Sequence, residues 1–513
     1  MKLTKEDFIQ IISGAYTNKN SIFLGSAIYN QELCKEAQIS IPLKTLNRHG
    51  LIAGATGTGK TVSLQLMAES LCKAGVPVLL MDLKGDLAGL SQAGDIKSKA
   101  AERNQSLGLE FNPSKNSVEF LTLTHKSGVP LRATVSEFGP VLFSKILDLN
   151  DTQSGVVAML FKYADDKGLL LLDLDDFKQL LQHSLQEGKK ELQQTYGNIS
   201  STSISTILRK VVELESQGAD VFFGEKSFEV NDLLQIDSEG NGQCAVISLA
   251  DIQDKPKLFS TFMLCLLAEI YATFPEAGDL EKPKLCLFID EAHLLFKNAS
   301  DALLEQIESI VKLIRSKGVG LFFVTQNPTD IPDAVLSQLG LKVQHALRAF
   351  TEKDRKAIKK AAENFPITNY YDTAETLTSL GIGEALVTAL NEKGIPSPLA
   401  AVRLKAPESR IGSISADEMG MVLKSSRLLL KYKEVINRES AYEILSKKIQ
   451  LKTEEEEPVI EKRKEKEAPS LIESVSSNPL MKQIGRTVAR ELTRGLLGVL
   501  GFKSNSRNKR GLF

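Results

Sequence analysis

A segment rich in glycine and threonine, ending in a lysine, carries the clearest chemical signal in the sequence. Residues 54–61 read GATGTGKT and fit the pattern G-x-x-x-x-G-K-[ST], after a short apolar run and at the start of a helical one. Glycines let successive backbone N–H groups point at phosphate oxygens, and the helix N-terminus adds positive potential. The pattern predicts an ATP site in which Lys60 reaches the β- and γ-phosphates and the Thr61 hydroxyl binds Mg²⁺. The predicted nucleotide-binding residues of this loop are Gly54, Ala55, Thr56, Gly57, Thr58, Gly59, Lys60, Thr61 and Val62.

Two acidic residues follow a second apolar run. Residues 284–289 (KLCLFI) lead directly into Asp290 and Glu291, which fits a Walker B element. We expect Asp290 to hold Mg²⁺ through water and Glu291 to act as a general base on the attacking water, because phosphoryl transfer depends on positioning and charge stabilisation. His293 completes the letters D-E-A-H. Lys60 and Asp290 are 230 positions apart, however, and no arginine-rich helicase segment follows, so the spacing argues against a DEAH-box helicase.

Other polar side chains are expected close to the phosphates. Gln326 follows the apolar run 319–324, and we expect it to contact the γ-phosphate or the attacking water. The segment 82–86 (DLKGD) ends another apolar run at the same predicted sheet edge, where ligands of parallel sheets bind. Lys84 in this segment fits two roles equally well: coupling the nucleotide to a polymer, or forming part of a helix cap or turn.

Three arginines are candidates for contact with the nucleotide. Arg315 lies between the Walker B element and Gln326, and Arg348 follows the apolar run 342–347. Either could be an arginine finger that enters a neighbouring subunit's site. Arg48 precedes the loop of residues 54–61 and is a candidate for contact within its own subunit. Surface arginines are common, so each of the three also fits an ordinary structural position.

The elements that must position these residues read as an α/β domain. Apolar runs at 51–53 and 76–81 flank a helical pattern at about 61–74, and further runs follow at 244–249, 284–289, 319–324, 342–347, 384–390 and 399–404. This order predicts a mainly parallel sheet in a P-loop core formed by residues 49–131 and 219–405. Residues 132–218 have helical periodicity and predict a helical insertion. Residues 1–48 predict a short N-terminal helix and β segment.

The chain changes character after the last of these runs. Residues 406–450 predict a helical extension, and the charge-dense residues 451–479 predict a linker. In residues 480–513, apolar and basic positions each recur every four residues, which predicts a basic amphipathic helix. Three partners remain open for this helix: an oligomeric ring of the chain itself, an anionic membrane surface that it would touch peripherally, and DNA.

Composition limits the class of protein. The 513 residues are 42% hydrophobic and 25% charged, which is typical of a soluble globular protein. The sequence has no long uncharged apolar run and no secretory leader pattern, and its five cysteines are scattered, so we expect a cytoplasmic protein with reduced thiols.

Charge is unevenly distributed along the chain. Residues 481–513 have eight Lys or Arg and one Glu, a net charge of +7, which leaves a net charge of −8 on the other residues. This acidic body argues against a passive nucleic-acid coat, but not against a motor that grips DNA through a few pore loops.

Several motifs, in order, resemble those of the bacterial branch of the HerA-like ATPases, in the HerA–FtsK group. They read RHGLIAGATGTGKT, VLLMDLKGDLAGL, LFIDEAHLLF, RSKGVGLFFVTQNPTDIP and LRAFTEKDRKAI. The resemblance covers about residues 22–445 and resumes near the C-terminus. It implies a RecA-like P-loop fold with the sensor strand between the P-loop and Walker B strands, and a homohexameric ring with ATP sites at subunit interfaces. In the family pattern, Arg315 matches a trans arginine and Arg48 a cis arginine.

The resemblance implies an ATP-hydrolysing DNA translocase or helicase. Archaeal HerA has a full N-terminal β-barrel that docks a nuclease, whereas only about 45 residues precede the P-loop here, which argues against a NurA-like nuclease partner. Two other functions stay open on the residues alone. One is an ATPase motor for protein or another polymer, and the other is a slow, nucleotide-gated assembly or regulatory protein.

Overall fold

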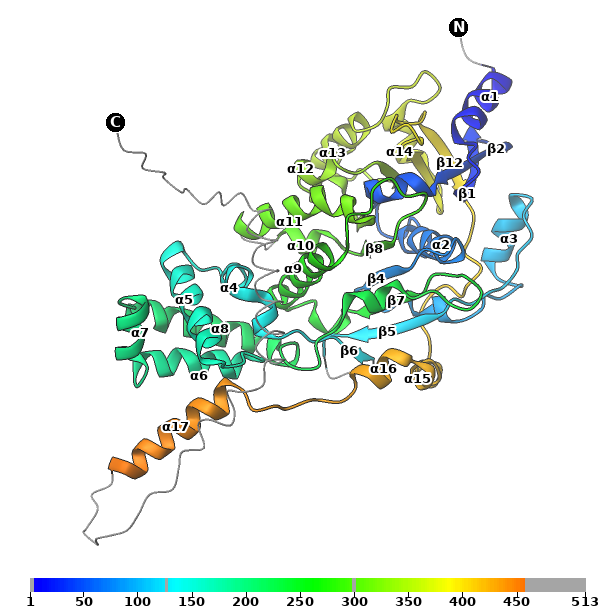
Figure 1. The fold of residues 1–513 in the computed structure, drawn as a ribbon. Coiled ribbons are helices and arrows are strands. Elements are labelled where there is room, and N and C mark those ends of the chain that lie inside the picture. The colour runs from blue at the N-terminus through cyan, green and yellow to red at the C-terminus, as the bar shows by residue number, and fades with distance from the viewer. Residues whose placement is uncertain (1–3, 125–127, 298–300, 457–513) are drawn as a thin grey trace, which may run out of the picture. The chain divides into compact units, whose positions relative to one another are not determined.

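A twelve-stranded sheet forms the centre of the first of two compact units. The structure is a computed structural model that describes residues 4–124, 128–297 and 301–456 (Figure 1). The first unit contains residues up to 130 together with 229–259 and 273–433. The second contains residues 131–228, 260–272 and, among the described C-terminal residues, 434–456.

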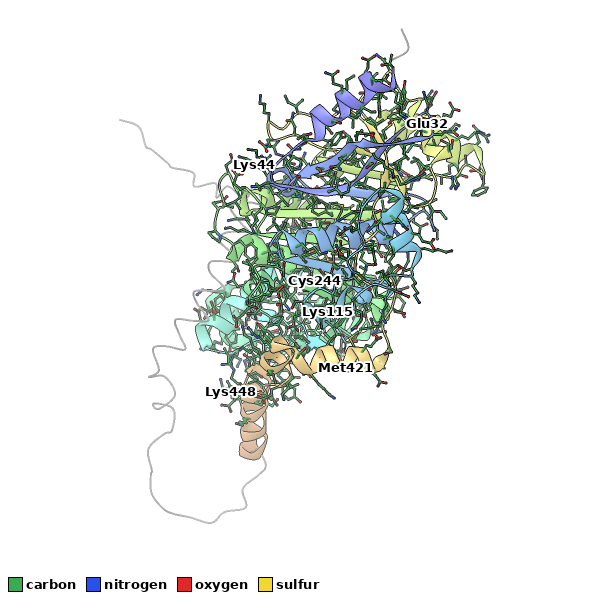
Figure 2. The ribbon with its side chains drawn as sticks, turned by 90° about the vertical axis from the view of Figure 1, so that its right-hand side faces the viewer. Glu32, Lys44, Lys115, Cys244, Met421 and Lys448 are labelled. Carbon is green, nitrogen blue, oxygen red and sulfur yellow. The ribbon has the colours of Figure 1, made fainter. Side chains whose placement is uncertain are left out.

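The strand order of the sheet is β2-β1-β12-β11-β10-β3-β9-β8-β4-β7-β5-β6. Neighbouring strands are parallel from β10 to β6 and antiparallel from β2 to β10. Figure 2 shows Glu32 of β2 and Lys115, which precedes β5, towards opposite ends of this order. The strands are β1 (Ser21–Tyr29), β2 (Glu32–Pro42), β3 (Gly50–Ala53), β4 (Val78–Asp82), β5 (Val118–Thr122), β6 (Val129–Pro130), β7 (Cys244–Ser248), β8 (Leu285–Ile289), β9 (Val319–Thr325), β10 (Leu341–His345), β11 (Glu384–Thr388) and β12 (Ala400–Leu404).

The central strands bring the predicted site residues to one edge of the sheet. Every residue of β3, β4, β8 and β9 is buried, which explains why these strands read as continuous apolar runs. Ala53 lies opposite Thr325, and Ile289 lies opposite both Phe323 and Met81, so the carboxyl ends of the four strands are nearly level. The sensor strand β9 lies between the P-loop strand β3 and the Walker B strand β8, as the resemblance implied.

The N-terminal segment 1–48 contributes strands β1 and β2 to this sheet. β1 pairs with β12 antiparallel, with Ser26 opposite Arg403. Helix α1 (Lys5–Tyr16) is tied to the same region, because Tyr16 Oη donates a hydrogen bond to Pro398 O at 2.6 Å. The partner strand lies more than 370 positions away in sequence, and local patterning carries no signal for such a pairing.

Strand β5 was not expected from the sequence, because an acidic residue interrupts its apolar pattern. Glu119 in its second position is only 6% exposed and accepts a short hydrogen bond from Ser426 Oγ. The other helices of the first unit are α2 (Lys60–Lys73), α3 (Lys99–Ser106), α10 (His293–Lys297), α11 (Asp301–Ile314), α12 (Asp333–Leu336), α13 (Glu352–Glu363), α14 (Thr373–Ser379), α15 (Ala416–Ser425) and α16 (Arg427–Tyr432).

The second unit is helical and contains the predicted insertion 132–218. Its core includes an aromatic cluster in which Phe143 meets Phe177 edge-on, with ring centroids 4.9 Å apart. Its helices are α4 (Val135–Ile146), α5 (Asp151–Lys167), α6 (Leu174–Leu185), α7 (Lys189–Tyr196), α8 (Ser201–Ser216), most of α9 (Pro256–Thr273) and α17 (Ala441–Glu456). Helix α17 extends into the segment predicted as a linker. The rest of that segment and the predicted amphipathic helix 480–513 lie outside the described residues.

None of the described helices combines the length and the apolar composition needed to cross a lipid bilayer. Four of the five cysteines are buried, as expected: Cys34, Cys72, Cys244 and Cys286.

Candidate nucleotide site

The loop between β3 and α2 wraps around the side chain of its lysine. Ala55 N donates to Ala346 O at 2.9 Å, which fixes the loop to the strand beside it. Lys60 Nζ donates to Gly54 O at 2.7 Å and to Ala55 O at 3.1 Å, so its ammonium group spans the loop. Thr61 follows in the first turn of α2. The predicted phosphate loop therefore has the strand–loop–helix setting that its sequence requires.

Two glycines of this loop are required by the backbone. Gly54 has φ +157°, and a Cβ there would lie 2.5 Å from His345 Cβ. Gly59 has φ +109°, and a Cβ there would lie 3.2 Å from Gly383 N. His345 was missed in the sequence: its Nε2 lies 2.9 Å from Ser63 Oγ behind the loop, and burial lowers its pKa to about 4. A histidine inside the apolar run 342–347 was the available signal.

Asp290 is suited to hold a cation. Its side chain is almost fully buried, and its Oδ2 has no hydrogen-bond partner among the described residues. Burial, followed by the neighbouring charge of Glu291, raises the pKa of Asp290 to about 6. A buried carboxylate oxygen without a partner costs free energy unless a cation satisfies it. Together with the Thr61 hydroxyl, this oxygen fits the ligand preference of Mg²⁺.

Three polar side chains surround Glu291. Lys84 Nζ lies 2.6 Å from Oε1, while Gln326 Nε2 and His293 Nδ1 lie 3.5 Å and 3.4 Å from Oε2. Burial alone would raise the pKa of Glu291, but the hydrogen bond and charge of Lys84 outweigh it and hold the pKa below its ordinary value. Glu291 is thus a buried, ionised carboxylate, and its backbone is left-handed with φ +47°.

Gln326 connects the phosphate loop to the Walker B pair. Thr56 Oγ1 donates to Gln326 Oε1 at 3.4 Å, and Gln326 Nε2 donates to Glu291 at 3.5 Å. Both contacts are near the upper limit for hydrogen bonds, so the Gln326 amide can shift towards a ligand. A cavity of about 580 Å³ opens beside it, lined by His293, Phe296, Gln326, Thr329, Asp330 and Pro332.

The turn after β4 presents Lys84 to this group. Asp82 Oδ1 accepts hydrogen bonds from Gly85 N at 2.7 Å and Lys84 N at 3.2 Å, and Asp82 Oδ2 accepts from Leu87 N at 3.0 Å. Asp82 is 1% exposed, so the turn is anchored from inside the protein. Lys84 therefore lies in a turn, one of the two roles predicted from the sequence, and its ammonium group also contacts Glu291.

Arg48 and Arg315 lie at the opposite edge of the sheet from the phosphate loop. Arg48 precedes β3 and Arg315 precedes β9, whereas the loop follows β3. Burial and then the nearby charge of Arg48 lower the pKa of Arg315, so the two guanidinium groups lie close together. His49 and the four residues of β3 separate Arg48 from Gly54. Contact of Arg48 with the nucleotide of its own subunit stays a prediction.

Arg348 lies on the side of its own phosphate loop. It follows the carboxyl end of β10, two residues after the Ala346 carbonyl that binds the loop, and its Nη1 donates to Thr378 O at 2.9 Å. The guanidinium group of Arg348 thus has a partner within its own subunit. Entry into a neighbour's site stays a prediction for both Arg348 and Arg315.

Known proteins with a similar sequence include a helicase and a DNA import protein. The "DNA double-strand break repair helicase HerA" of Sulfolobus acidocaldarius is 23% identical over 371 residues, which are 68% of this chain and 64% of that protein. The "DNA import protein CedB" of the same organism is 24% identical over 69% of this chain and 52% of that protein. The chain thus spans between about half and two thirds of the length of these two relatives.

Solved structures share the fold. The bacterial conjugative coupling protein TrwBdeltaN70 in its unbound form has a TM-score of 0.52 at 14% identity, over 78% of this chain and 92% of that chain. The plasmid coupling protein TrwB in complex with ADP and Mg²⁺ has the same TM-score over 79% of this chain and 93% of that chain. At this identity the likeness shows the fold alone, a RecA-like P-loop α/β fold. The family model described as "Helicase HerA-like C-terminal" matches residues 28–505, and the chain therefore belongs to the HerA-like helicase C-terminal family.

Proposed function

We propose that the chain is an ATP-hydrolysing motor that moves DNA and whose sites are completed between neighbouring copies. The observation that carries this proposal is the arrangement at the carboxyl edge of the sheet. Asp290 and Glu291 follow β8, which lies two places from β3, the strand that leads into the phosphate loop. One buried oxygen of Asp290 has no partner among the described residues, and Glu291 is ionised.

The proposed reaction is hydrolysis of the γ-phosphate bond. Lys60 binds the β- and γ-phosphates, and Asp290 and Thr61 hold Mg²⁺, which offsets the negative charge of the phosphates. Glu291 accepts a proton from water as the water oxygen bonds to the γ-phosphorus. The bond from that phosphorus to the bridging oxygen breaks, and ADP leaves with the electron pair. Gln326 orients the water through the two long contacts that its amide makes.

A second copy is proposed to supply Arg315. Because Arg315 and the phosphate loop lie at opposite edges of the same sheet, an arginine that reaches phosphate must come from a neighbour. A contact between two different edges of identical subunits is heterologous, and such contacts form a ring where the rotation between copies closes. The proposed ring is a homohexamer, as in the family that the sequence resembles. Arg48, beside Arg315, joins the same interface.

DNA as the moved polymer is supported by the names of the relatives, which are a DNA repair helicase and a DNA import protein. The test is the rate of ATP hydrolysis measured with and without single- and double-stranded DNA, with particle mass measured alongside. We expect DNA to raise the rate several-fold in a particle of hexameric mass. A rate that rises with unfolded protein and not with DNA would favour a protein motor. A slow rate that no polymer changes, with assembly that follows ATP, would favour a nucleotide-gated assembly protein.

A further inference from the structure

We propose that Lys84 is a positioning residue that restrains Glu291 and keeps the basal rate of ATP hydrolysis low. The inference rests on the proposed function, because it takes Glu291 as the general base. The two groups come from turns at the ends of β4 and β8, which are adjacent strands. Lys84 Nζ lies 2.6 Å from Glu291 Oε1, the shortest of the contacts described for this carboxylate.

The two partners differ in freedom. The Glu291 side chain is 5% exposed, whereas the Lys84 side chain is 45% exposed. The carboxylate therefore cannot leave without moving its neighbours, while the ammonium group can swing into solvent. The ion pair therefore opens when Lys84 moves, while the buried Glu291 carboxylate stays in place for hydrolysis.

The backbone around the pair is arranged to hold it closed. Asp82 fixes the turn of Lys84 with hydrogen bonds to backbone N–H groups at positions 84, 85 and 87. On the other side, Glu291 has φ +47°, a left-handed conformation that costs free energy in a residue with a side chain. Strain of this kind persists only where surrounding contacts impose it, and it is found at switch regions and active sites.

The chemistry gives the direction of the effect. A general base needs a carboxylate lone pair aimed at the water whose proton it accepts. Lys84 occupies Oε1, and the two weaker contacts of Gln326 and His293 occupy Oε2. With Lys84 in place, the Oε1 lone pair that faces the ammonium group is not available to water. Movement of Lys84 frees this lone pair, so the ion pair lowers the fraction of time in which Glu291 can act.

The test compares Lys84→Met and Lys84→Arg in the full chain, without polymer. We expect Lys84→Met to raise kcat for ATP by about fivefold, the scale of a partly exposed ion pair, with the KM for ATP unchanged. Lys84→Arg keeps the positive charge and should stay near the wild-type rate. The matched control is Lys5→Met, which removes a lysine that pairs with Glu32 at 2.7 Å on the surface, and it should leave kcat unchanged.

The outcomes separate the two proposals. A wild-type protein without ATPase activity would contradict the proposed function and not the restraint alone. An active wild type in which Lys84→Met has a lower kcat or a higher KM would overturn the restraint, because Lys84 would then serve the phosphates. An unchanged kcat would also overturn it. In the double variant Lys84→Met/Glu291→Gln the increase must disappear, and a surviving increase would show that Lys84 acts elsewhere.

Discussion

At the scale of single residues, binding and hydrolysis depend on different side chains of one site. Lys60 spans the phosphate loop, and Glu291 lies at the end of β8. We expect Lys60→Ala to abolish ATP binding nearly completely, because the phosphates lose their main side-chain cation. Glu291→Gln should preserve binding and retain ATP, because the amide keeps size and polarity but cannot accept the proton. Binding of a fluorescent ATP analogue and phosphate release check the two variants. Normal hydrolysis by Glu291→Gln would show that the Walker B assignment is wrong.

The backbone of the loop makes a second prediction at this scale. In Gly54→Ala the new methyl group would meet His345 Cβ at 2.5 Å while φ stays at +157°, so we expect the loop to shift at a cost of about 1–3 kcal/mol. ATP affinity should fall by a factor of ten or more, as measured by titration. The matched control is Gly14→Ala in α1, where a Cβ would have no atom within 4 Å. That variant should bind ATP normally.

Most of the residues that the structure brings together at the carboxyl edge of the sheet were predictable, because they belong to short local patterns. The pattern G-x-x-x-x-G-K-T and an apolar run ending in two acids each lie within ten residues. The contact between Lys84 and Glu291 joins positions 207 apart, and that between Ser63 and His345 joins positions 282 apart. Such pairings depend on strand order, which no local pattern determines.

At the scale of elements, the predicted central strands and the P-loop helix agree with the structure to within about two residues at most ends. Their apolar runs are continuous because both faces of each strand are buried. The failures have physical causes. β5 was missed because it contains a buried carboxylate. The β segment within residues 1–48 was predicted, but its pairing with a strand near residue 400 was not, because the two strands lie far apart in sequence.

A buried histidine joins three of these elements and gives a pH-dependent prediction. His49 precedes β3; its Nε2 lies 2.8 Å from Val311 O in α11, and its Nδ1 accepts from Leu321 N of β9 at 3.0 Å. Burial lowers its pKa from 6.5 to about 4, partly offset by the Val311 contact and reinforced by the charge of Arg315. Between these pH values the unfolded chain binds the proton more readily, so stability must fall as the pH drops.

The loss should approach about 3 kcal/mol for this one histidine by pH 4. We expect the thermal unfolding midpoint to fall between pH 7 and pH 4, and the fall to be smaller in His49→Gln, whose amide can replace both hydrogen bonds. His345 has the same pKa shift, so part of the pH dependence should remain in that variant. A fall of equal size in the variant and the wild type would contradict the prediction.

At the scale of the whole molecule, the position of Arg315 predicts sites shared between copies. We expect Arg315→Ala to lower kcat by about 10³–10⁵, the effect of arginine fingers in other NTPases. The decisive measurement mixes Arg315→Ala and Glu291→Gln subunits after dissociation. If subunits exchange at random, about a quarter of the heterologous interfaces contain both intact residues, so activity should partly return. If activity does not return, Arg315 acts within its own subunit, or it only stabilises the fold of that subunit.

The hairpin at the start of the chain has a consequence for how the protein is made. β1 lies between β2 and β12, and Tyr16 of α1 bonds to Pro398, so these elements find their sheet partners more than 370 residues later in the chain. Loop closure over such a separation is slow, and unpaired strand edges attract other chains in the meantime. On the ribosome, one strand edge of the hairpin therefore stays unpaired until some 400 residues have emerged. Chaperone demand and the yield of soluble protein should depend on how long this edge is unpaired, more than on any residue of the nucleotide site.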